Sequence, residues 1–247
     1  MLHPPRPSRR QLLAAASATV LSAQDPSPSR LRVVCVGGHP DDPESGCGGT
    51  LARYAALGHA VTILYLTRGE AGIPGKSHEE AARIRSVECE AACRTLGARA
   101  VFAGQIDGAT VVDAKAADSL RRLIAAENPD AVLTQWPIDT HLDHQAAATL
   151  SFRAWLASGR NFDLYYYEVN AGSQTLNFHP TDYVDITTVR EKKMTALFAH
   201  KSQDGEAIYR NHHRIMEEFR GREAGVTAAE AFVRLAPGRR RGTLPGL

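Results

Sequence analysis

The feature that most constrains the fold of this chain is a regular alternation of short apolar runs with longer segments of helical periodicity. Apolar runs of the kind that form buried strands cover residues 31–36, 59–66, 100–103 and 130–136. Segments with apolar residues at helical spacing cover residues 46–57, 78–96, 113–127 and 142–157. Strands that alternate with helices of this length indicate βαβ units, so the sequence predicts an α/β fold with a mainly parallel sheet.

The pattern changes after residue 160. Strand-like runs at 164–169 and 183–186 precede helical segments at 189–200 and 206–219. We expect this part of the chain to complete the sheet and to cover one edge of the functional site. A chain of 247 residues, 43% of them hydrophobic, can bury one sizeable core, so we assign residues 24–236 to a single domain.

The first 23 residues are typical of a bacterial export signal. Arg9 and Arg10 precede an apolar, alanine-rich run, and Leu21-Ser22-Ala23 offers a small-residue cleavage site. Paired arginines of this kind resemble a twin-arginine signal, so we expect an exported, periplasmic protein. The alternatives are a disordered arm or a membrane anchor, but the apolar run is too short to span a bilayer, and we expect no span in the mature chain.

Charge and cysteine content narrow the class further. The formal net charge is +2, which gives no indication of nucleic-acid binding. The basic Arg239–Arg241 cluster lies in a Pro/Gly-rich tail, residues 237–247, which we expect to be a solvated end rather than a docking patch. The four cysteines show no Cys-x-x-Cys spacing, and we expect buried free thiols rather than disulfides.

Unusual polar residues gather directly after three of the predicted strands. Residues 37–44 read GGHPDDPE, residues 67–72 read TRGEAG, and residues 137–144 read PIDTHLDH. Ligands of an open parallel sheet bind at the carboxyl ends of its strands, where these three loops should meet.

Two of these loops carry residues that could hold a metal ion. His39 and Asp42 are three residues apart in the first loop, as are His141 and His144 in the last. An imidazole and a carboxylate from one loop with an imidazole from the other give three N/O ligands, which suits a catalytic zinc with an open position for water. Asp41 and Asp42 cannot both face the metal equally, so one would ligate it and the other could act on water. The alternative is a set of ordinary core or surface histidines.

Two other kinds of site are disfavoured. The glycines at 37–38 and 46–49 lack the Gly-x-Gly-x-x-Gly spacing of a dinucleotide loop, and His-Pro-Asp-Asp occupies the turn. A Gly-x-Ser-x-Gly elbow is absent from the sequence, which argues against a serine hydrolase.

The loops, taken together, resemble the LmbE-like, or PIG-L, family of de-N-acetylases. The motifs, in family order, are His39-Pro-Asp-Asp-x-Glu44, Gly48-Gly-Thr-Leu51, Thr67-x-Gly-Glu-x-Gly72 and His141-x-Asp-His144. The resemblance extends over about residues 31 to 205 and includes Arg85-x-x-Glu88 and His200-x-x-Gln203. Pro43 departs from the commonest form of the first motif.

The resemblance implies a Rossmann-like three-layer fold and a zinc-dependent amidohydrolase that removes an N-acetyl group from an amino sugar or glycoconjugate. It assigns His39, Asp42 and His144 to the zinc and Asp41 to proton transfer. His141 would face the developing oxyanion, with Asp143 orienting and charging it. Rival hypotheses are a metal-dependent hydrolase of another bond, such as a phosphoester, and a silent sugar-binding protein on the same fold.

Other charged residues of these loops could contact the substrate or brace the structure. Arg68, Glu70 and Asp107 could bind substrate hydroxyls, and the alternative for each is a surface or loop-bracing charge. We expect Glu44 to support the first loop. Arg85 and Glu88, one helical turn apart, could instead form a bracing ion pair.

Overall fold

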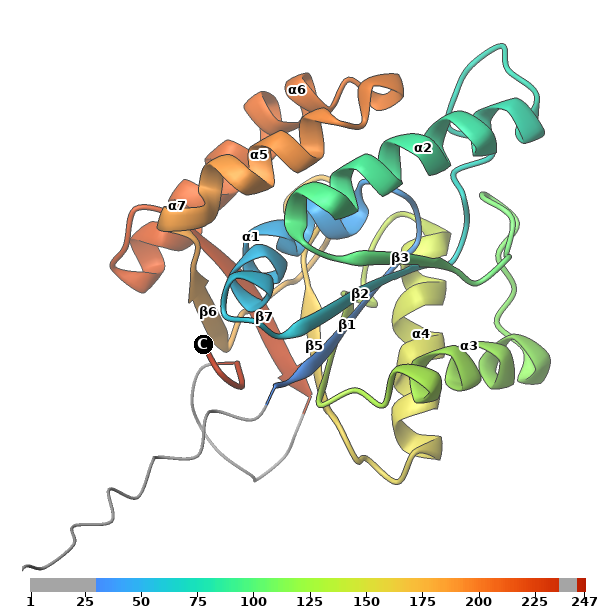
Figure 1. Cartoon of the computed structure of the whole chain (residues 1–247), viewed down its shortest axis with the longest axis horizontal. Helices are drawn as coiled ribbons and strands as arrows, with labels where there is room; N and C mark the ends of the chain where they lie inside the picture. The colour runs from blue at the N-terminus through green and yellow to red at the C-terminus, as the bar shows by residue number, and fades with distance from the viewer. Residues whose placement is uncertain (1–29, 236–243) are drawn as a thin grey trace, which may run out of the picture.

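A computed structural model describes residues 30–235 and 244–247 of the chain. Within these residues, seven strands form one sheet in the order β3-β2-β1-β4-β5-β7-β6 (Figure 1). The strands are β1 (Arg32–Gly37), β2 (Ala60–Tyr65), β3 (Arg99–Phe102), β4 (Ala131–Gln135), β5 (Asp163–Tyr167), β6 (Asp182–Asp185) and β7 (Ala229–Leu235). The first five are parallel, and β7 is antiparallel to both β5 and β6. The predicted α/β fold with a mainly parallel sheet is therefore confirmed.

Helices cover both faces of the sheet, which makes three layers. They are α1 (Asp42–Ala56), α2 (His78–Leu96), α3 (Ala114–Glu127), α4 (Leu142–Ala157), α5 (Arg190–Phe198), α6 (Gly205–Ile208) and α7 (Arg214–Ala224). One buried apolar cluster joins the sheet to α1, α2 and α5, and a second joins it to α3 and α4. Figure 1 shows these two groups of helices on opposite sides of the strands.

Two predicted helices have the predicted bounds. For α2, the Ser77 side chain accepts the Glu80 N–H at the start, and Gly97 ends the helix at φ 78°. A serine N-cap is a strong local signal for the start of a helix, and a left-handed glycine is one for its end. The bounds 78–96 therefore depend little on tertiary packing. The helix α4 likewise covers residues 142–157 as predicted.

The register of the parallel strands brings the polar loops to one edge. Gly37 at the end of β1 pairs with Tyr65 at the end of β2, and Val36 pairs with Thr134 near the end of β4. The loops that follow β1, β2 and β4 therefore leave the sheet side by side.

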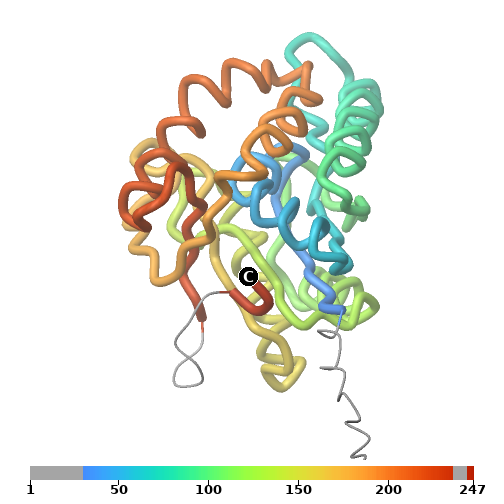
Figure 2. Tube along the Cα trace, turned by 60° about the vertical axis from the view of Figure 1, so that its left-hand side comes forward, coloured from blue at the N-terminus to red at the C-terminus, as the bar shows by residue number. Residues whose placement is uncertain are grey.

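The C-terminal third of the domain differs from the expectation. The strand β7 was not predicted, and it lies between β5 and β6. The predicted helix at 206–219 is three segments: α6, a π-helical turn at Tyr209–His213, and α7. In Figure 2 this part of the chain, coloured orange to red, lies beside α1 (blue) and α2 (teal). The α5 helix contacts both α1 and α2.

The end of the chain packs against the domain. Leu244 is buried in the core, and Gly246 lies beside Leu31 and His59. The solvated end was predicted for the Arg239–Arg241 cluster, which precedes these residues. The predicted export signal and Arg239–Arg241 lie outside the described residues. The four cysteines are buried and free, as expected. The described helices include none with the length and apolarity needed to cross a membrane.

Candidate metal centre and cavity

The three predicted metal ligands lie together at the carboxyl edge of the sheet. Asp42 stands between two histidines: its Oδ2 is 3.0 Å from His39 Nδ1, and its Oδ1 is 3.2 Å from His144 Nε2. His39 follows the end of β1, Asp42 begins α1, and His144 lies in the first turn of α4. All three side chains are buried.

Each of the two histidines uses its second ring nitrogen on another carboxylate. His39 Nε2 lies 2.9 Å from Asp143 Oδ2 and 3.1 Å from Asp107 Oδ1, and His144 Nδ1 lies 3.1 Å from Asp139 Oδ1. Histidines that bind metals commonly donate their other ring N–H to a carboxylate, which fixes the ring and its tautomer. The sequence reasoning did not single out Asp139, although it lies in the loop that carries His141.

The charges of this cluster favour a bound cation. Burial by itself would favour neutral rings, but the surrounding carboxylates, Asp42 foremost, raise the pKa of His39 well above its ordinary value and that of His144 to about 9. Two nitrogen donors and one carboxylate are ligands that zinc takes, and the nitrogens of His39, His141 and His144 also lie within 4.8 Å of one another. The residues present therefore fit a zinc ion.

Asp41 lies beside the cluster in an unusual backbone conformation. It is the N-cap residue of α1, with φ 107° and ψ −30°, a region that side-chain-bearing residues rarely adopt. Its Oδ1 is 3.2 Å from Nη2 of Arg85, which also donates to the Pro40 carbonyl. Burial raises the pKa of the Asp41 carboxyl to about 6, although Arg85 opposes this, and the Asp42 charge adds to it.

Glu44 supports the loop that carries His39 and Asp41, as expected. It accepts the Asp41 N–H at 3.2 Å and the Tyr65 hydroxyl at 2.7 Å, and it lies 3.1 Å from His200 Nε2. Tyr65 and His200 hold the Glu44 carboxylate, which in turn holds the backbone of Asp41 in position.

The predicted alternative of an Arg85–Glu88 ion pair is wrong. Arg85 turns toward Pro40 and Asp41, whereas Glu88 accepts the backbone N–H and the hydroxyl of Ser202. Their one-turn spacing places them on one helix face, but each finds a partner on a different loop.

His141 lies at the start of α4 against both metal-site histidines. Its ring centroid is 4.7 Å from that of His144 and 4.6 Å from that of His39. Its Nδ1 accepts the Asp143 backbone N–H at 3.3 Å, which leaves Nε2 to carry the proton of the neutral ring. Burial, together with His39 and His144, lowers the pKa of His141.

The predicted hold of the Asp143 carboxylate on the His141 ring is present only as charge: it opposes the lowering of the His141 pKa by burial, but its hydrogen bonds go elsewhere. The carboxylate turns instead to His39, and it accepts the Gly108 N–H at 2.8 Å and the Thr110 hydroxyl at 2.6 Å. A carboxylate oxygen of Asp143 nevertheless lies within 4.8 Å of a ring nitrogen of His141, in a group that also includes His39 and Asp107.

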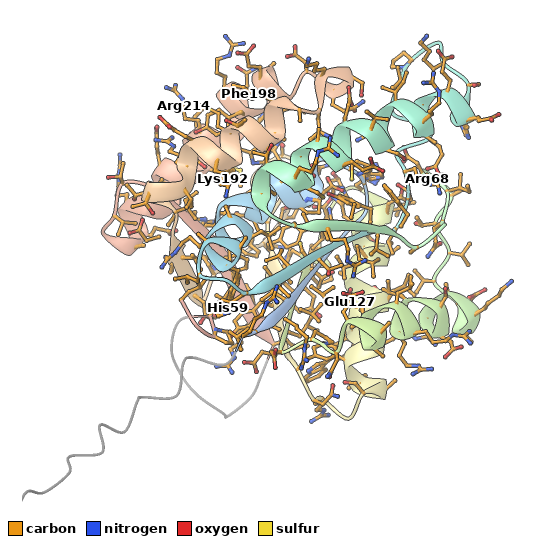
Figure 3. The ribbon with its side chains drawn as sticks, in the orientation of Figure 1. His59, Arg68, Glu127, Lys192, Phe198 and Arg214 are labelled. Carbon is orange, nitrogen blue, oxygen red and sulfur yellow. The ribbon has the colours of Figure 1, made fainter. Side chains whose placement is uncertain are left out.

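The three residues predicted to bind substrate hydroxyls, Arg68, Glu70 and Asp107, have different surroundings in the structure. Asp107 lines the cavity and contacts His39. Glu70 is buried, and its Oε2 accepts the backbone N–H groups of Arg68 and Asp107, so it braces two loops. Arg68 is exposed over the Phe102 ring and lies at the periphery in Figure 3. The structure therefore does not bring Arg68 or Glu70 to the cavity.

The cluster opens into a cavity of about 540 Å³. His39, Asp41, Asp42, His141 and His144 line one side. The same cavity is also lined by Gln203, which belongs to a predicted motif, and by residues that the sequence did not single out: Val169, Asn170, Gln174, Ile208, His212 and His213. The signal that could have found Asn170 is its position just past β5, at the same sheet edge as the other loops.

The fold and the His/Asp cluster define a family. The family description PIG-L, GlcNAc-PI de-N-acetylase, matches residues 34–155. The chain belongs to the PIG-L, or LmbE-like, family of deacetylases.

Several relatives match nearly the whole domain. A diacetylchitobiose deacetylase of Thermococcus kodakarensis is 29% identical over 225 residues, 84% of each chain. The structure of an N,N'-diacetylchitobiose deacetylase from Pyrococcus horikoshii is 25% identical, with a TM-score of 0.74 and 87% of each chain covered. The conserved protein TT1542 from Thermus thermophilus is 32% identical, with a TM-score of 0.71, covering 85% of this chain and 97% of that one.

Proposed function

We propose that this protein is a zinc-dependent N-deacetylase that hydrolyses the N-acetyl group of an amino-sugar-containing substrate. The observation that carries the proposal is the placement of Asp41 and His141 on one cavity with the His39–Asp42–His144 cluster. Membership of the PIG-L family and the names of the relatives support the choice of an N-acetyl sugar over other substrates.

His39, Asp42 and His144 would hold the zinc. When bound there, zinc supplies Lewis acidity, which makes water a better nucleophile and polarises an amide carbonyl. The outer carboxylates Asp139 and Asp143 hold the two imidazoles in place and increase their basicity.

Asp41 is the proton carrier of the proposed reaction. Its carboxylate takes a proton from the attacking water as the water oxygen bonds to the acetyl carbon, and it gives that proton to the amide nitrogen as the C–N bond breaks. The products are acetate and a free amine. Arg85 and Glu44 hold this side chain and its backbone at the cavity surface.

His141 stabilises the negative charge that develops on the carbonyl oxygen. Because Nδ1 accepts a backbone N–H, the proton of the neutral ring is on Nε2, where it can be donated to that oxygen. A neutral donor suffices for this role, so the charged imidazole that the sequence suggested is not needed.

We also propose that the protein is exported, on the paired arginines and apolar run of its first 23 residues. The sugar substrate would then be met outside the cytoplasm.

The test is a screen of the purified, zinc-loaded chain against N-acetylated amino sugars, with free amine and acetate measured together. We expect the two in equal amounts, and a loss of about 100-fold or more in turnover in Asp41→Asn with zinc content unchanged. Asp118→Asn, an exposed carboxylate on α3, is the matched control. Phosphate release from a phosphoester, or no amine from any sugar, would refute the proposal.

A further inference from the structure

Four polar residues without an acid among them line the same cavity as the metal cluster. Asn170 and Gln174 come from the segment after β5, and His212 and His213 come from the π-helical turn. Amide and imidazole groups both donate and accept hydrogen bonds, as a sugar hydroxyl does. We call these four residues the second wall.

His213 is a buried polar side chain that lacks a protein partner. It is 4% exposed, and it lines the cavity. Among residues 30–235 and 244–247, none forms a hydrogen bond or an ion pair with its ring. Buried polar groups in native proteins are nearly always hydrogen-bonded, so a ring nitrogen left facing a cavity points to a ligand.

The π-helical turn that presents His213 is held by a buried charge network. Tyr209, at the start of the turn, donates its hydroxyl to Glu217 at 2.6 Å, and Arg190 contacts the same carboxylate oxygen at 2.6 Å. Lys193 lies 2.8 Å from Glu230 and 3.4 Å from Glu217. Single π turns inside helices are frequent at functional sites, where they redirect a side chain.

The chemistry around His213 keeps its ring neutral. Burial, and then the positive charge of Lys193, hold the pKa of His213 well below its ordinary value. A neutral imidazole has one donor and one acceptor nitrogen, which a hydroxyl can satisfy in either direction.

The charges of the protein side chains favour an uncharged ligand at the second wall. Asp41, Asp42 and Asp107 line it, and Arg85 is the one lysine or arginine among its described lining residues. The Arg85 guanidinium is already bonded to Pro40 and Asp41. The second wall itself contributes neither lysine nor arginine, and the zinc would be held away from it by His39, Asp42 and His144, so a phosphate or carboxylate bound at the second wall would lack a basic side chain to pair with it.

We propose that the second wall is a saccharide subsite for a neutral sugar, and that His213 hydrogen-bonds a hydroxyl of that sugar. This inference rests on the proposed function, since it places the sugar in the same cavity as the groups that hydrolyse the amide. It adds the substrate class, uncharged rather than phosphorylated or carboxylated, and a residue that determines specificity.

The test is calorimetric binding of N-acetylglucosamine and of its 6-phosphate to the zinc-loaded, full-length Asp41→Asn chain, in which turnover is about 100-fold or more slower. We expect the neutral sugar to bind at least about tenfold more tightly, because the phosphate is desolvated without a partner. Adding His213→Ala should weaken the neutral sugar about tenfold, the effect of one lost hydrogen bond that leaves a group unpaired. His213→Gln should recover most of this, and His179→Ala, an exposed histidine outside the cavity, should change nothing.

Equal or tighter binding of the phosphate, no binding of the neutral sugar, or a His213→Ala affinity within twofold of the parent overturns the inference. If His213→Ala does not fold, His213→Leu fills the same space without polar atoms and makes the same comparison. Amine release by the wild-type chain separates the two proposals. Release without a His213 effect refutes the subsite alone, and sugar binding without release refutes the deacetylase alone.

Discussion

The buried ring of His213 should make this protein less stable as the pH falls. A histidine paired with a carboxylate would have the opposite effect. The folded-state pKa lies well below the ordinary value of 6.5, because of burial and of Lys193, with His212 also opposing protonation and Asp42 favouring it. Below pH 6.5 the unfolded chain therefore takes up a proton that the folded chain does not. Stability is fully present above the unfolded pKa and is lost as the pH falls below it.

The magnitude follows from this linkage. One such proton changes the free energy of unfolding by about 1.4 kcal/mol per pH unit, so lowering the pH from about 7 to about 5 costs at most about 2 kcal/mol. Other acids beneath the ring do not cancel this, because Glu168, Glu217 and Glu230 are paired with Arg220, Arg190 and Lys193 respectively.

The measurement is urea unfolding of the wild-type chain and of His213→Gln at about pH 7, 6 and 5, at one ionic strength and with a chelator, so that metal release contributes to neither curve. The variant should lose up to about 2 kcal/mol less than the wild type across this range. His179→Gln serves as the control, because His179 is exposed. A difference between His213→Gln and wild type that is the same at all three pH values would show that the ring is protonated in the folded state.

Four further predictions concern other parts of the chain. His144→Ala should lose most bound zinc, measured by metal analysis after dialysis, since it removes one of three ligands. His141→Ala should keep its zinc and lose about 10²–10³ in turnover, the effect of one oxyanion donor; loss of zinc would instead make His141 a ligand. Lys193→Met should lower the free energy of unfolding by about 3–5 kcal/mol in urea titrations, because buried carboxylates lose their cation. Lysines in place of Arg9 and Arg10 should strand the precursor in the cytoplasm of a bacterial host, and an unchanged distribution on fractionation would exclude the twin-arginine route.

The parts of the fold that local chemistry determines were predictable. The apolar runs and their spacing predict the parallel strands, and caps such as Ser77 and Gly97 predict helix ends to the residue. The strand β7 was not predictable in this way. Its Glu230 is buried against Lys193 and the backbone of α1, so the strand reads as an amphipathic segment until its partners are known. The π-helical turn likewise depends on the tertiary contacts of Tyr209.

For the site, the sequence predicts which loops meet but not where each side chain points. His39, Asp42 and His144 come together because parallel strands end at one edge of the sheet. Arg68 is in the predicted loop but points outward, which no spacing rule shows. His213 belongs to no motif, and its place on the cavity follows only from how the last helices pack.

The left-handed backbone of Asp41 has a consequence for how this site can evolve. A residue with a side chain held at φ 107° stores strain of about 1–3 kcal/mol, and glycine would relieve much of it. Asp41→Gly should therefore melt at a higher temperature than Asp41→Ala, although both lack the carboxylate. Folding stability alone would therefore favour glycine at this position, although glycine lacks the carboxylate that the proposed reaction needs. The aspartate thus stands where backbone stability alone would favour glycine, as expected of a residue whose side chain serves the proposed reaction.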